Sequence, residues 1–228
     1  MKRRLLMKIQ HLFFRRRTLY APTGLGLVSL ASLFFGPLIW WFYRGESFLS
    51  ASRRMEGASL LIVEGWIGPE GLAAAKAEFE AGHYALIVTS GGTTITDGWE
   101  RGGWNYAAGA AEHFIRSGVP REKILAAPAP ESESGRTYGS ARVVREKLDA
   151  LGLHPKAVNV FTAGTHAGRS ALVFAKALGP KTKVGVIAWQ VPGENTATPW
   201  WRNSERARNL IAESAGFFYE LFLNSGRA

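Results

Sequence analysis

Two residues that stand three positions apart, His166 and Arg169, carry the clearest chemical signal in this sequence. They follow the β-rich run Val160 to Ala163 through a turn of small residues, so the first turn of a helix would present both on one face. A helix N-terminus favours anions and lowers the pKa of a histidine, and an arginine fork suits a phosphate or carboxylate. The spacing therefore predicts an oxyanion site with His166 as acid, base or nucleophile. The alternative is that His166 only bonds a neighbouring carbonyl group.

A carboxylate stands at the end of the first apolar run, where Glu64 follows Leu60 to Val63. A charge placed directly on the end of a buried strand is expensive and usually has a function. We predict that Glu64 moves protons together with His166. The alternative is a surface carboxylate that caps the following helix.

Two further segments could hold an anion. Ser90, Gly91 and Gly92 follow the second apolar run, and paired glycines expose backbone N–H groups that form an anion-binding nest. Two glycines are also the simplest way to make a sharp turn. Thr137 opens a predicted helix, where it is either a ligand-binding hydroxyl or an ordinary N-cap.

Several kinds of site are excluded or disfavoured by composition and motif. The chain has no cysteine, and its five histidines show no metal-ligand spacing, so we predict no metal site. The serine hydrolase elbow and the phosphate-binding P-loop are both missing. The sequence identifies no cofactor.

The elements that must position these residues alternate between strands and helices, which predicts an α/β fold. Consecutive apolar positions, as in Leu60 to Val63, indicate strands covered on both faces, as in a parallel sheet. The predicted fold is a three-layer, Rossmann-like open parallel sheet, where ligands bind at the carboxyl ends of the strands. The predicted strands are 60–63, 85–90, 124–127, 157–163 and 184–189, and the predicted helices are 71–81, 106–117, 137–151, 166–178 and 204–223.

The last of these helices has apolar residues that we expect to pack on the sheet, namely Leu210, Ile211, Phe217, Phe218, Leu221 and Phe222. Trp200, Trp201 and Arg202 precede it and would line a pocket mouth, touch lipid headgroups or simply pack. The residues between Thr94 and Trp104 are predicted to form an irregular rim or lid.

The front of the chain predicts a membrane anchor. Seven Lys or Arg residues lie within the first 17 positions, and an uncharged apolar run follows from Ala21 to Tyr43. At about 1.5 Å per residue this run spans roughly the 30 Å of a bilayer core. The positive-inside bias places the N-terminus in the cytoplasm and the rest of the chain outside. A cleaved signal peptide, ending near Ser50 to Ser52, and a buried core helix are the alternatives.

The predicted organisation is therefore a basic cytoplasmic segment (1–20), a transmembrane helix (21–43), a linker (44–57) and an extracytoplasmic α/β domain (58–228). The formal net charge of the chain is +10, and the front segment supplies seven of these charges. Because the remainder is close to neutral, nucleic acid is not an expected partner, whereas the lipid bilayer is.

The order of the motifs resembles the YdcF-like family, which includes SanA- and ElyC-type envelope proteins. The similarity covers about residues 58–185 and rests on LIV in the first strand, TSGG in the second, GVP with Lys123 and Ile124, the RTY segment and the FTAGTHAGR block. It implies a tethered Rossmann-like domain of the cell envelope, with Thr162, His166 and Arg169 in its main motif. No single reaction is settled for the family.

Two positions depart from the family's pattern, because Tyr106 and Gly139 stand where carboxylates are usual. Either Glu64 replaces one of these carboxylates, or catalysis has been lost. The first functional hypothesis is a tethered, enzyme-like domain acting on an anionic envelope component, such as a phosphorylated or glycan-linked intermediate. The second is a non-catalytic binding or scaffold protein attached to a membrane complex.

Overall fold

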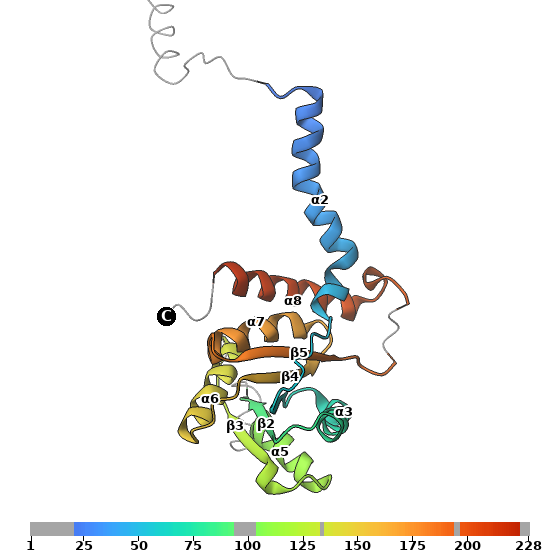
Figure 1. The fold of residues 1–228 in the computed structure, drawn as a ribbon. Helices are drawn as coiled ribbons and strands as arrows, with labels where there is room; N and C mark the ends of the chain where they lie inside the picture. The colour runs from blue at the N-terminus through green and yellow to red at the C-terminus, as the bar shows by residue number, and fades with distance from the viewer. Residues whose placement is uncertain (1–20, 94–103, 133–134, 194–196, 224–228) are drawn as a thin grey trace, which may run out of the picture. The chain divides into compact units, whose positions relative to one another are not determined.

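The computed structural model of this 228-residue chain describes residues 21–93, 104–132, 135–193 and 197–223 (Figure 1). The predicted basic segment, residues 1–20, lies outside the described residues, as does most of the predicted rim, residues 94–103. The chain divides into two compact units, residues 1–43 and residues 44–228.

Within the described residues of the second unit, five parallel strands form one open sheet in the order β3-β2-β1-β4-β5. The strand order reverses beside β1, because β1 pairs with β2 on one side and with β4 on the other. The predicted α/β fold with a parallel sheet is therefore confirmed. The strands are β1 (Leu60–Glu64), β2 (Leu86–Gly91), β3 (Ile124–Pro128), β4 (Ala157–Ala163) and β5 (Lys183–Trp189).

Helices cover both faces of the sheet, as Figure 1 shows. The helices α3 (Gly68–Ala81) and α5 (Tyr106–Arg116) contribute to one apolar core. The helices α6 (Arg136–Ala150) and α7 (His166–Leu178) contribute to the other. The three layers follow from the sequence, since buried parallel strands need an apolar helix face on each side. Two short 3₁₀ turns, η1 (Arg121–Lys123) and η2 (Trp200–Arg202), complete the connections.

The alternation of side chains along β1 decides where its final carboxylate lies. Leu61 and Val63 belong to the core beneath α3 and α5, whereas Leu60 and Ile62 belong to the core beneath α6 and α7. Successive residues of a strand point to opposite faces, so Glu64 lies on the α6 and α7 side. The same rule places Thr162 of β4 on that face, two residues after the buried Val160.

The last helix, α8 (Ser204–Phe222), packs against α7. Leu210 and Phe217 are buried as predicted, but the prediction that the other four apolar residues of the stripe also pack inward is wrong. Residues 211, 218, 221 and 222 are exposed, whereas Glu220 is buried and Glu213 is largely buried. The reason is the periodicity of the helix. Residues 210, 213, 217 and 220 are spaced three, four and three apart, so they share the face that is turned inward.

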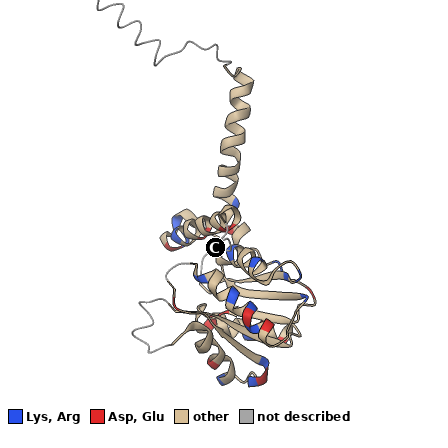
Figure 2. Ribbon diagram, turned by 90° about the vertical axis from the view of Figure 1, so that its left-hand side faces the viewer, with Lys and Arg blue, Asp and Glu red and all other residues tan. Residues whose placement is uncertain are grey.

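The helix α2 (Gly24–Leu49) begins near the start of the predicted membrane span and extends six residues beyond its predicted end at Tyr43. It is long and apolar enough to cross a membrane. Figure 2 shows no Lys, Arg, Asp or Glu along most of its length. The side chains in its most apolar stretch are exposed, unlike those of a core helix.

The last residues of α2 belong to the second unit, where they pack against α7 and α8. Glu46 accepts two hydrogen bonds from the buried Arg206, at 2.8 and 2.6 Å. Phe48 meets Phe217 edge to face, with ring centroids 5.7 Å apart. Leu49 is fully buried, and a Cβ atom at Gly168 would lie 2.6 Å from its side chain. Residues 44–57, which we predicted as a linker, hold these contacts.

We expect Arg206→Ala to lower the free energy of unfolding of the detergent-solubilised chain by about 3 kcal/mol. Removal of the guanidinium would leave the Glu46 carboxylate without its partner in a largely buried pair. The guanidinium of Arg206 is 3% exposed and also donates to the carbonyl of Thr198 at 2.8 Å. Chemical unfolding followed by circular dichroism measures the loss. The matched control is Arg208→Ala on the same helix, where the pair with Glu205 is exposed and should contribute less than about 1 kcal/mol. Equal losses in the two variants would contradict a structural role for the buried pair.

Candidate functional site

The reversal of strand order between β1 and β4 creates a crevice at the carboxyl edge of the sheet, which is where doubly wound folds bind ligands. Glu64 ends β1, and His166 begins the helix that follows β4. A cleft of about 790 Å³ opens at this edge, bordered by the ends of β1 and β2, the first turns of α6 and α7, and one side of α8. The predicted residues Glu64, Ser90, Thr137, His166 and Arg169 all line it.

Glu64 is buried, and its charge is compensated by groups on α7. The Ser170 hydroxyl donates to its Oε2 at 2.8 Å, and the Nε2 of His166 lies 3.5 Å from the same oxygen. Burial alone would raise the pKa of the Glu64 carboxyl, but the charge of His166 and the hydrogen bond from Ser170 lower it below its usual value. Glu64 is thus a carboxylate at neutral pH, and it does not cap α3 as a surface residue would.

His166 lies between two carboxylates. Its Nδ1 contacts Oε1 of Glu213 at 3.0 Å, and its Nε2 faces Glu64. Burial would lower the pKa of the imidazole, but Glu64 and Glu213 outweigh this effect and raise it to about 9. The expectation that the helix N-terminus lowers this pKa is therefore wrong, because two nearby carboxylates are stronger than one helix dipole. The ring is an imidazolium ion at neutral pH.

Arg169 completes the network through the same carboxylate. Its Nε donates to Oε2 of Glu213 at 2.8 Å, and its Nη2 donates to Oε1 at 2.9 Å, in a bidentate pair. Burial would raise the pKa of Glu213, but His166 and Arg169 together lower it to about 2. The Nη1 of Arg169 also donates to the Thr137 hydroxyl at 3.4 Å. Two cations and two carboxylates therefore form one compensated cluster.

Thr137 and Thr162 have surroundings that the sequence did not predict. Gly135, in the left-handed conformation, is the N-cap of α6, so Thr137 is the second helical residue and not the cap. Thr162 is fully buried, and its hydroxyl has no hydrogen-bond partner among the described residues. The Nε2 of the buried His166 likewise lacks a partner with hydrogen-bond geometry there. Trp66 covers the ring of His166 edge to face, with centroids 5.0 Å apart.

The glycine turn after β2 has a packing explanation. A Cβ atom on Gly91 would lie 3.0 Å from Tyr106, and one on Gly92 would lie 2.8 Å from the carbonyl oxygen of Ala129. Gly91 also has a φ of +132°, which side chains rarely allow. The Ser90 hydroxyl is buried and points to the carbonyl of Val63 at 3.4 Å. The turn borders the cleft, and its role as an anion nest stays a prediction.

Sequence reasoning missed Glu213, which holds both His166 and Arg169. The residue stands in the middle of a helix, 47 positions after His166, and no local motif marks it. One signal was available, because Glu213 and Glu220 occupy the same helix face as Leu210 and Phe217. Acidic residues on an otherwise apolar face indicate buried partners.

The chemistry that this cluster supports is electrostatic. Because its pKa is raised to about 9, His166 is suited at neutral pH to hold charge or donate a proton rather than to act as a general base. Among the described residues, no three His, Cys, Asp or Glu side chains form a group that could hold a metal ion.

Comparison with protein-family models gives no match for this chain, and no curated protein matches it either. The resemblance to the YdcF-like family stays a prediction.

We expect the stability of the domain to fall as pH rises from 6.5 towards 9, because the raised pKa of His166 favours the folded state only while the imidazolium persists. A shift from 6.5 to about 9 corresponds to a contribution on the order of 3 kcal/mol. The free energy of unfolding, measured across this range, should lose that slope in His166→Gln. The control His154→Gln, at an exposed position, should keep it. A slope that survives in His166→Gln would assign the pH dependence to other groups.

Glu213→Gln should lower the pKa of His166 by more than one unit, since the neutral amide no longer stabilises the imidazolium. Titration of the His166 ring protons by NMR measures this change directly. Glu205→Gln, on the exposed side of α8, is the control and should leave the titration unchanged. An unaltered pKa in Glu213→Gln would mean that Glu64 alone holds the charge on the ring.

Proposed function

We propose that this chain is a membrane-anchored protein whose α/β domain binds an anionic component of the cell envelope, of the phosphorylated or glycan-linked class. The observation that carries the proposal is the first turn of α6, whose residues 135–140 border the cleft that His166 and Arg169 also line. Gly135 has no side chain with which to cap this helix. The first N–H groups of a helix have no acceptor within it, so an anion bound beside the first turn of α6 could accept from them.

The carboxylates that line the cleft, Glu64, Glu131, Glu213 and Glu220, equal the lining cations in number, so the case for an anion at this helix rests on the two arginines of α6. Arg136 and Arg142 line the cleft from α6, and neither belongs to the cluster that surrounds Glu213. The volume of about 790 Å³ lies within the range of roughly 300 to 1,000 Å³ typical of small-molecule sites, which suits a sugar phosphate or a headgroup of similar size.

The cluster favours binding over base catalysis. An imidazolium held between Glu64 and Glu213 has no free lone pair for a proton, so His166 is not a general base at neutral pH. A non-catalytic binding or scaffold protein fits this arrangement. Enzymatic turnover is the second candidate, favoured by the position of the protonated His166 at the edge of the cleft, where it could act as a general acid.

The envelope location rests on the front of the chain. The helix α2 is apolar enough to cross a membrane, and the seven cations before it favour a cytoplasmic N-terminus with the domain outside. The resemblance to the YdcF-like family supports the same location. Cleavage near Ser50 to Ser52 would remove Glu46 and Leu49, which are partners of Arg206 and Gly168 in the folded domain. We therefore favour a retained anchor over a signal peptide.

The charge at the N-terminus of α6 is the variable that tests binding. Gly135→Asp and Gly135→Asn have nearly the same shape, a Cβ atom meets nothing there, and both residues tolerate the left-handed conformation better than most. We expect the aspartate variant to bind phosphate, sugar phosphates or lipid-linked pyrophosphates at least about tenfold more weakly than the asparagine variant, because it places a like charge beside the anion. Thermal shift of the full chain in detergent measures the affinities. Equal affinities in the two variants would show that this helix does not hold the anion.

A ligand found in this screen also separates the two candidates. His166→Ala and Glu64→Gln should retain most of the binding to α6, because neither residue belongs to that helix. If the protein is an enzyme, both variants lose product formation. If ligand binding occurs without any product in the unmodified chain, the domain is a binding protein.

A further inference from the structure

From residue 211 onward, the outer surface of α8 differs from that of an ordinary surface helix, because its charged residues face inward and most of its apolar residues face outward. Over residues 211–223, all of which the structure describes, the two carboxylates are turned inward. Glu213 pairs with Arg169, and Glu220 pairs with Lys176. The exposed side chains are uncharged and mostly apolar, and Phe222 and Ile211 are 72% and 64% exposed. This set consists of Ile211, Ala212, Ala215, Phe218, Tyr219, Leu221, Phe222 and Leu223, and we call it the outer face of α8.

Something apolar must cover such a surface, because several large hydrophobic side chains exposed side by side indicate an interaction site. We propose that the outer face of α8 lies in the headgroup region of the membrane that holds α2. The partner in this proposal is the lipid bilayer. The inference rests on the membrane insertion of α2 and is independent of what binds in the cleft.

Chain continuity is the first argument for lipid. The end of α2 contacts α8 at two places, where Glu46 meets Arg206 and Phe48 meets Phe217. In the sequence, the apolar run ends at Tyr43, only three residues before Glu46. The chain itself therefore holds α8 within reach of the point where the apolar run ends.

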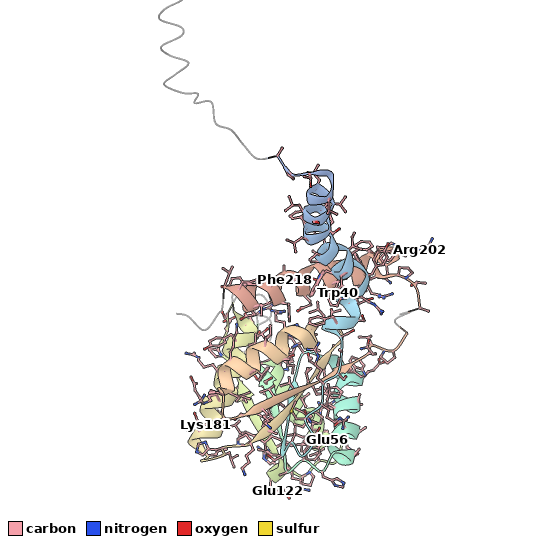
Figure 3. The ribbon with its side chains drawn as sticks, turned by 45° about the horizontal axis from the view of Figure 1, so that its top comes forward. Trp40, Glu56, Glu122, Lys181, Arg202 and Phe218 are labelled. Atoms are coloured by element: carbon pink, nitrogen blue, oxygen red, sulfur yellow. The ribbon has the colours of Figure 1, made fainter. Side chains whose placement is uncertain are left out.

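Composition is the second argument. Aromatic and aliphatic residues form the outer face, and no exposed carboxylate lies between residues 211 and 223 to oppose anionic lipids. The exposed Arg202 and Trp201 precede the helix. Figure 3 places Phe218 and Arg202 towards opposite ends of the α8 region. An apolar face flanked by arginine and tryptophan is typical of helices that lie in a membrane interface.

The absence of cysteine from the sequence makes a direct test available. Phe222→Cys in the full chain, carrying a nitroxide label, is reconstituted into vesicles of phosphatidylcholine and phosphatidylglycerol. The matched control is Leu151→Cys, an exposed apolar position at the end of α6. We expect the ratio of collisions with oxygen to collisions with a water-soluble nickel chelate to be severalfold higher at position 222 than at position 151. Ile211→Cys, on the same face, should behave like Phe222→Cys.

Equal ratios at positions 222 and 151 would overturn the proposal, since the outer face would then be in water. Magnetic coupling between labels at position 222, lost when unlabelled protein is added in excess, would show a second copy of the chain on this face and would also overturn it. None of the three variants changes a residue that lines the cleft, so anion binding can be measured in the same samples and judged separately.

Discussion

The buried charge of Glu64 is the constraint on which the architecture of the site depends. The carboxylate at the end of this central strand is only 3% exposed, so the fold must supply most of its partners. His166 and Ser170 do so from two successive turns of α7. The imidazolium then needs a second acceptor, because one carboxylate leaves Nδ1 unbonded. Glu213 meets this need and also binds Arg169, so a single compensated cluster fixes α7 against β1 and α8 against α7.

The helix α8 therefore has two structural roles. Its inner side supplies Glu213 to the cluster and accepts the end of α2 through Arg206 and Phe217. Its remaining surface is apolar from residue 211 onward. A helix that turns its carboxylates inward and large apolar side chains outward leaves an apolar surface for a partner, for which we propose the lipid bilayer.

The fold could be predicted from sequence because its signals are local. Apolar runs such as Leu60 to Val63 mark buried strands, and the alternation with helices fixes the parallel sheet. The switch-point rule then brings Glu64 and His166 to one edge. The role of Glu213 could not be predicted from the sequence, because it depends on which face of α8 packs against α7, and that is decided by tertiary structure. The direction of the pKa shift of His166 could not be predicted for the same reason, since it follows from two carboxylates that are distant in the sequence.

The close approach at Gly168 has a consequence for comparing sequences of this architecture. Glycine is needed there because the backbone and side chain of Leu49 occupy the space of a Cβ atom. A domain of the same fold that lacked the segment ending at Leu49 would have no steric reason to keep glycine one position before the arginine of the cluster. We therefore expect glycine at this position in chains that pack a residue like Leu49 against the first turn of α7.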